Sequence, residues 1–139
     1  MIAGGCLCGR VRYEAQGEPL FAVVCHCRDC QRASGAGHMP VIGFWKSAFR
    51  LTGETRSYAV VGGSGKLAVR HFCPNCGSML LGMPEVAPQV VTVYVGTLDD
   101  PEAFQAQHAQ FTRDRPEWGR LALRIAEYEE AGVVALERL

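Results

Sequence analysis

The hydrophobic positions of this chain fall into short segments that have the period of β-strands. Val11 to Ala15 alternates apolar and polar residues, and residues 89–95 are almost entirely β-branched or aromatic, which favours an extended strand over a helix. The glycine-rich turn at residues 62–65 precedes an alternating segment from Lys66 to Phe72, which predicts a β-hairpin. Further segments of strand length are predicted at residues 20–24, 39–44, 49–52 and 57–61.

Helical signals are few and short. The sequence predicts one turn of helix at residues 29–34 and a capped turn at residues 100–104. After Pro116, apolar residues recur at spacings of three and four, which predicts a short C-terminal helix docked on the sheet; its apolar face is formed by Trp118, Leu121, Ile125 and Tyr128. With 139 residues and no internal repeat or linker, we expect one domain spanning residues 1–139.

The composition fits a folded protein and narrows its partners. Hydrophobic residues make up 48% of the chain and charged residues 20%, a balance that supports a packed core. Basic and acidic residues are equal in number, 14 of each, which argues against nucleic acid as the main partner. The longest apolar run covers residues 20–25, far short of the roughly 20 residues of a membrane-spanning helix. Because no secretory signal is visible either, we expect a cytoplasmic protein that does not enter a membrane.

Cysteine is the residue type that carries the chemistry. The seven cysteines form three groups: Cys6 and Cys8; Cys25, Cys27 and Cys30; Cys73 and Cys76. In a reducing compartment, clustered cysteines more often hold metal than form disulfides, and an odd number fits this interpretation. Disulfides within a group would close strained loops of a few residues, whereas neighbouring sulfurs can converge on one ion. We therefore predict zinc as a cofactor.

Two of the groups predict a closed structural site. The segment Cys73-Pro74-Asn75-Cys76-Gly77 has the pattern of a zinc knuckle, in which proline shapes the turn and glycine relieves crowding. A tetrahedral site needs two more ligands, and Cys6 and Cys8 form the other simple pair. The four thiolates would join the N-terminus to the strand that ends near Cys73, so loss of this site should unfold the domain.

The central group predicts a different kind of site. Three sulfurs with no obvious fourth ligand are typical of a zinc ion that keeps a position for a substrate. One alternative is that a histidine completes the site, and the candidates are His38, His71 and His108; His26, between two ligands, cannot easily reach the same ion. A second alternative is a redox pair at Cys27 and Cys30 or in the knuckle, although neither pair lies in a predicted strand-to-helix crossover.

The charge of three thiolates narrows the reaction. On a divalent ion they leave a local charge of minus one, so such a site activates water less well than three neutral imidazoles do. A thiol that enters the fourth position would lose its proton and still keep nucleophilic character toward carbon. A zinc deaminase would need a glutamate two residues after a ligand, and no histidine or cysteine of the chain has one. Thiol chemistry therefore fits better than hydrolysis or deamination.

Four segments together resemble a known family. The chain has Gly4-Gly5-Cys6-Leu7-Cys8-Gly9, the run from Cys25 to Gln31, Ser34-Gly35-Ala36, and the run from Phe72 to Ser78. In this order, from residue 1 to about 120, they resemble the glutathione-dependent formaldehyde-activating enzyme family. The resemblance implies an all-β fold of folded-over antiparallel sheets, a β-tent. It also implies a structural zinc on Cys6, Cys8, Cys73 and Cys76, and a catalytic zinc on Cys25, Cys27 and Cys30.

The resemblance further implies an activity and a partner. The reaction would be the addition of the glutathione thiol to formaldehyde, giving S-hydroxymethylglutathione, which is carbon–sulfur lyase chemistry. Glutathione is anionic, and the nearest cations in the sequence are Arg28, Arg32, Lys66 and Arg70. His108 and Trp118 resemble late positions of the family, where we expect packing only. Two alternatives stay open: a zinc-stapled binding module without catalysis, and a lyase that uses another electrophile.

Overall fold

The computed structural model describes residues 1–132, and strands dominate them. The smaller sheet has the order β1-β2-β5 and consists of β1 (Ile2–Gly5), β2 (Arg12–Ala15) and β5 (Phe49–Thr52). The larger sheet has the order β11-β10-β3-β4-β9-β8-β7-β6 and consists of β3 (Phe21–Cys25), β4 (Met39–Trp45), β6 (Arg56–Val61), β7 (Leu67–Phe72), β8 (Met79–Pro84), β9 (Val90–Tyr94), β10 (His108–Gln110) and β11 (Ala126–Glu127). Pairing is antiparallel except around β10, which runs parallel to both β3 and β11. The all-β class is therefore confirmed.

Helical structure is confined to short pieces. The described residues contain one α-helix, α1 (Arg28–Ser34), which follows β3 directly and ends at Gly35 in the left-handed conformation. Asp100 caps η3, as the sequence predicts. The short 3-10 turns are η1 (Lys46–Ala48), η2 (Val95–Thr97), η3 (Pro101–Ala103), η4 (Thr112–Asp114) and η5 (Glu117–Gly119). None of the helices in residues 1–132 is long and apolar enough to cross a lipid bilayer.

The strand predictions are confirmed to within about two residues, whereas four strands were missed. Each predicted segment corresponds to one of β2, β3, β4, β5, β6, β7 and β9. The glycine turn joins β6 to β7 in an antiparallel hairpin, with Val61 opposite Leu67. The missed strands β1 and β8 are rich in glycine or contain proline, and β10 and β11 are only three and two residues long. None of them shows an alternating pattern long enough to detect.

The predicted C-terminal helix is wrong for the residues that the structure describes. After Pro116 the chain makes the single turn η5 and then the strand β11, which pairs with β10. Tyr128 donates its backbone N–H to the carbonyl of Ala109 at 2.9 Å, so hydrogen bonds that a helix would form locally go to β10 instead. Trp118, counted on the apolar face of that helix, is 75% exposed. The remainder of the predicted segment, residues 133–139, lies outside the described residues.

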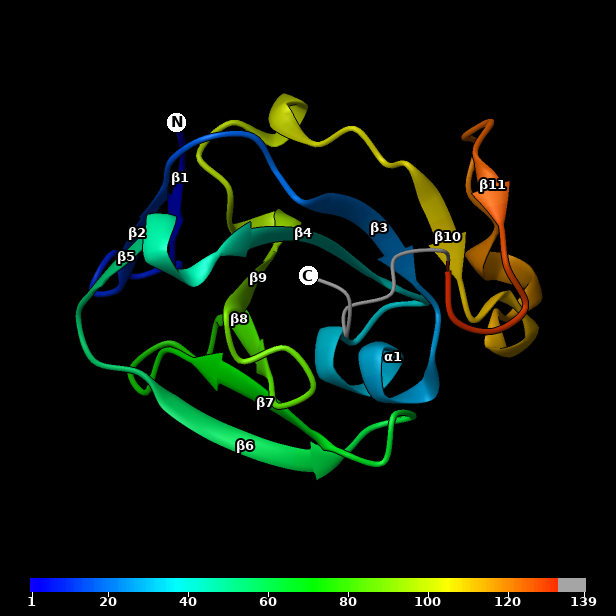
Figure 1. Cartoon of the computed structure of the whole chain (residues 1–139), viewed down its shortest axis with the longest axis horizontal. Helices are drawn as coiled ribbons and strands as arrows, with labels where there is room; N and C mark the ends of the chain where they lie inside the picture. The colour runs from blue at the N-terminus through cyan, green and yellow to red at the C-terminus, as the bar shows by residue number, and fades with distance from the viewer. Residues whose placement is uncertain (133–139) are drawn as a thin grey trace.

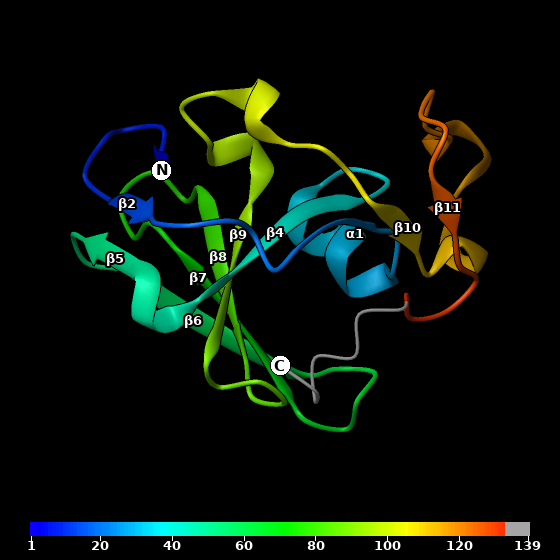
Figure 2. The same cartoon turned by 45° about the horizontal axis from the view of Figure 1, so that its top comes forward.

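Alternation along the central strands separates two cores. Ile42 and Phe44 of β4 join the core between the two sheets, together with Tyr13 of β2. Met39 and Val41 belong to a second core, on the face that carries α1. Figures 1 and 2 show α1 between the strands β3, β4 and β10 on one side and the hairpin β6–β7 on the other. The two-residue period of the strands therefore decides which side chains approach this helix.

Two candidate metal centres

The first candidate centre brings together two cysteine pairs that are far apart in the sequence. The sulfurs of Cys6, Cys8, Cys73 and Cys76 all lie within 4.8 Å of one another. Cys6 and Cys8 come from the turn between β1 and β2, and Cys73 and Cys76 from the turn between β7 and β8. We call this group the N-terminal cluster. The structure thus brings together the four residues that the sequence predicts for a closed site.

The two turns of the N-terminal cluster have similar backbone designs. In one, Gly9 adopts a φ of 79° and donates its N–H to the carbonyl of Cys6; in the other, Gly77 adopts a φ of 75° and donates to the carbonyl of Cys73. Positive φ is the reason for glycine at both positions. Each turn folds its cysteine side chains toward the other turn. The Ser78 hydroxyl links the turns further, since it accepts a hydrogen bond from the N–H of Leu7 at 3.0 Å.

Sulfur separations in the N-terminal cluster fit a metal and exclude a disulfide. The Sγ atoms of Cys6 and Cys8 are 3.5 Å apart, and those of Cys8 and Cys73 are 3.7 Å apart. A disulfide needs about 2.05 Å. Four sulfurs placed tetrahedrally at about 2.3 Å from one ion would be about 3.8 Å apart. Ser78 lowers the pKa of Cys76 to about 5, through hydrogen bonds from its hydroxyl and its backbone N–H, which favours the thiolate that a metal requires.

The second candidate centre comes from one continuous segment. Cys25 ends β3 and is buried, Cys27 is the N-cap of α1, and Cys30 lies in the first turn of that helix. Their sulfurs also lie within 4.8 Å of one another, and we call them the cysteine trio. The N–H of Cys30 donates to the Sγ of Cys27 at 3.4 Å, as expected for an N-cap. The strand end and the helix start therefore aim the three sulfurs at one point.

Hydrogen bonding within the trio shows how closely the sulfurs are coupled. Cys27 accepts from the thiols of Cys25 and Cys30, which lowers the pKa of Cys27 to about 2. The same bond to Cys27 raises the pKa of Cys25 to about 11, and bonds to the other two sulfurs, led by Cys25, raise the pKa of Cys30. Three sulfurs at such range compete for protons unless a cation replaces the protons. Sulfur-only donor sets suit zinc, so each of the two groups could bind a metal ion.

The structure brings no histidine into the trio among the residues that it describes. His26 is fully buried and points away, with its Nδ1 3.0 Å from the carbonyl oxygen of Gly37. His38 has its ring centre 5.6 Å from that of His26. His71 is hydrogen-bonded to Thr55, and His108 packs edge-on against Tyr128. A trio without a fourth protein ligand is the arrangement that suits an incoming ligand.

One of the four candidate cations reaches the trio. Nη2 of Arg70, on β7, lies 3.7 Å from Sγ of Cys30. Arg28 instead donates to the side chain of Gln31 in its own helix, and Arg32 and Lys66 are exposed. Sequence reasoning missed Tyr94, whose buried hydroxyl lies near Arg70 and whose pKa burial raises. A tyrosine at the end of a buried strand gives no sequence signal that separates it from core packing.

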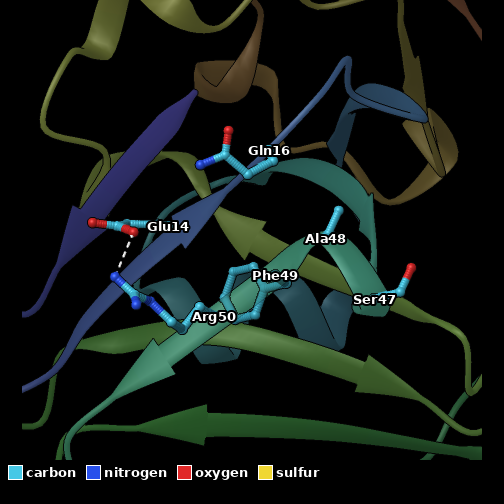
Figure 3. Close-up of a pocket in the computed structure, with 6 residues that line it drawn as sticks. All are labelled: Glu14, Gln16, Ser47, Ala48, Phe49 and Arg50. Atoms are coloured by element: carbon cyan, nitrogen blue, oxygen red, sulfur yellow. Dashed lines mark hydrogen bonds and ion pairs between the residues drawn. The ribbon is translucent and has the colours of Figure 1, made fainter.

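Two surface hollows are not lined by the trio. One, of about 430 Å³, lies on β2, β5 and η1, where Glu14 and Arg50 form an ion pair at 2.9 Å (Figure 3). It is lined by no cysteine or histidine. Another, of about 340 Å³, borders the N-terminal cluster at Cys73, Pro74 and Asn75. Donor chemistry, rather than hollow size, therefore identifies the trio as the candidate functional site.

Comparisons with known proteins agree with the cysteine pattern. The family described as "Glutathione-dependent formaldehyde-activating enzyme" matches residues 1–114, which include both cysteine groups. A crystal structure of a Rhodobacter sphaeroides protein is similar, with a TM-score of 0.55 and 25% sequence identity, over 73% of this chain and 93% of that one. No curated protein matches the chain. The match to the family ends before β11, so the C-terminal strand lies outside it.

Proposed function

Because the chain belongs to the glutathione-dependent formaldehyde-activating enzyme family, we propose that it adds a thiol, glutathione, to formaldehyde or a related small electrophile. The product with formaldehyde is S-hydroxymethylglutathione. The sulfur forms a bond to the carbonyl carbon, the carbon–oxygen π bond breaks, and the thiol proton ends on the oxygen. This makes the protein a carbon–sulfur lyase in the reverse direction. The convergence of three sulfurs without a fourth protein ligand among residues 1–132 carries the proposal.

Each part of the trio has a defined task in this proposal. Cys25, Cys27 and Cys30 would hold a zinc ion, which when bound lowers the pKa of a thiol that joins it. Buried Cys25 anchors the group to β3, while Cys27 and Cys30 are partly exposed and leave an approach from solvent. A thiol and an aldehyde held side by side react faster because their encounter no longer costs translational entropy. The N-terminal cluster would hold a second zinc with a structural role.

The rest of the proposal concerns the setting of the reaction. The cysteines must stay reduced to hold metal, so we assign the protein to the cytoplasm. Residues 1–139 would form one functional domain. Glutathione is the proposed thiol because the trio has a cation, Arg70, beside it for an anionic substrate.

Replacement of Cys27 by serine tests the assignment. Because Cys27 is only a local ligand, the variant should stay folded, keep about one zinc ion per chain, and lose turnover. Metal content, circular dichroism, and NMR of ¹³C-formaldehyde with glutathione against the spontaneous rate would measure this. A Ser34→Ala variant, on the same helix outside the trio, serves as the control and should keep both ions and the activity.

Two outcomes would contradict the proposal in different ways. A Cys27→Ser protein that loses both ions and aggregates would show that the trio is structural. A wild-type protein that binds two ions but does not accelerate the reaction would favour a different electrophile or the zinc-stapled binding module. A panel of aldehydes with glutathione separates these two.

A further inference from the structure

Arg70 lies in a cross-strand row that leads to the cysteine trio. On the larger sheet Arg70 of β7 is opposite Gly82 of β8, which is opposite Thr92 of β9. A side chain at Gly82 would collide with its neighbours, because a Cβ there would lie 2.7 Å from Oγ1 of Thr92 and 3.0 Å from the hydroxyl of Tyr94. Glycine at this position leaves room for Tyr94 beside Arg70. The guanidinium can then reach across to Cys30 on α1.

The charge of Arg70 has no carboxylate partner in the described part of the chain. The ion pairs there use Arg12, Arg50, Arg113, Arg115 and Arg120, all with acidic residues. The Nε atom of Arg70 is buried and has no hydrogen-bond partner within residues 1–132. Its neighbours are Cys30, Cys27 and the hydroxyl of Tyr94. A partly buried cation needs a compensating negative charge, and the trio is the group able to supply it.

We propose that Arg70 is a positioning residue that offsets the negative charge of the metal-loaded cysteine trio, so that the trio can accept an anionic thiolate as its fourth ligand. This inference rests on the proposed function for the choice of a thiol as that ligand. The contact between Arg70 and Cys30 carries it.

Charge counting shows why the cation matters. Three thiolates and one divalent ion sum to minus one, and a substrate thiolate brings the total to minus two. Such a charge in a partly buried position is costly. Arg70 brings the total back to minus one within contact distance of Cys30. Because the guanidinium does not lose its proton, this compensation is permanent.

Cobalt substitution tests the inference without relying on turnover. The variants are Arg70→Met and Arg70→Gln, which remove the charge, and Arg70→Lys, which keeps it. Arg32→Met, on the exposed side of α1, is the matched control. Each protein is loaded with cobalt(II), and the spectrum of a Cys27→Ser protein is subtracted to remove the contribution of the N-terminal cluster. Glutathione is then titrated against the absorption of the trio, and the rate of cobalt loss to a chelator is measured separately.

The expected results separate Arg70 from the rest of the site. Loss of the charge should weaken glutathione binding about tenfold and speed the loss of cobalt from the trio. Arg70→Lys should recover most of both, and Arg32→Met should stay within about twofold of wild type. Two neutral variants keep the test valid if one of them fails to fold.

Failure of this inference differs from failure of the proposed function. Neutral variants that bind glutathione and retain cobalt as wild type does would overturn the role of Arg70 while leaving the proposed function intact. If the cobalt(II) absorption of the wild-type trio does not change when glutathione is added, the proposed function is overturned. The chelator experiment then decides on Arg70 alone, because equal cobalt loss from Arg70→Met and Arg32→Met would reject charge compensation.

Discussion

The two cysteine groups differ in what they connect. The N-terminal cluster joins two turns far apart in the sequence, since Cys8 and Cys73, 65 positions apart, have sulfurs 3.7 Å apart. The cysteine trio lies within one segment, from the end of β3 to the first turn of α1. Closing a long loop costs more chain entropy than closing a short one, by about 0.6 kcal/mol for each doubling of loop length. A metal ion bound by the first group would therefore stabilise the fold more than an ion bound by the trio.

The cysteine trio does not connect segments that are distant in the sequence. Its three sulfurs are already close through local structure, so an ion there adds little long-range constraint. We therefore expect an ion at the trio to contribute less to stability and, under the proposed function, to bind the substrate thiol. Similar donor chemistry therefore has different consequences according to the sequence distance between the donors.

Replacement of Cys73 by serine should have the largest effect. A structural zinc ion contributes about 10–16 kcal/mol in small zinc domains, comparable to or larger than the whole stability of a typical domain, about 5–15 kcal/mol. We expect the variant to lose its cooperative thermal transition and its zinc. Circular dichroism melting and metal analysis, with Cys27→Ser alongside, measure this. A Cys73→Ser protein as stable as Cys27→Ser would erase the distinction between the two groups.

Replacement of Gly82 by alanine should have an intermediate effect confined to the side of the trio. The added Cβ meets Thr92 and Tyr94 at 2.7 and 3.0 Å, and overpacking of this kind costs about 1–3 kcal/mol. We expect a lower thermal midpoint, weaker glutathione binding, and unchanged zinc at the N-terminal cluster. Gly96→Ala is the control, because nothing lies within 4 Å of a Cβ there. If both variants melt alike, the crowding at Gly82 has no energetic weight.

Mild acid should lower the free energy of unfolding through His108, by less than the two substitutions above. His108 of β10 is 5% exposed, and burial lowers its pKa below the ordinary value of 6.5. The unfolded chain therefore takes up a proton before the folded chain does. The contribution of His108 to stability is complete above pH 6.5 and is lost as the pH falls through the lowered folded pKa.

A neutral variant isolates this histidine from other acid effects. The free energy of unfolding of wild type minus that of His108→Gln should fall as the pH is lowered from about 7.5 to about 5.5. Denaturant titrations at several pH values measure the difference, and loss of metal, common to both proteins, cancels. A difference that is constant with pH would show that His108 has the same pKa in the folded and the unfolded chain.

Much of the fold could be predicted because most of the strands have a recognisable local sequence pattern. The β-branched run of β9 and the glycine turn of the β6–β7 hairpin need no tertiary information. The prediction of a C-terminal helix is wrong because the spacing of apolar residues does not reveal that the edge strand β10 has backbone groups free to pair with this segment. The backbone N–H of Tyr128 donates to the carbonyl of Ala109 in β10, and Trp118 is exposed.

The order of residues was enough to predict the donor chemistry: which cysteines are close neighbours, which turns glycine permits, which family the pattern resembles, and that the knuckle of Cys73 and Cys76 pairs with Cys6 and Cys8. The folded structure was needed to show which cation contacts the trio: Arg70 does, whereas Arg28 bonds within its own helix and Arg32 and Lys66 are exposed. Neighbouring ligands and turns can be recognised because their spacing follows directly from the order of residues. Contact across strands depends instead on register, which places Arg70, Gly82 and Thr92 in one row.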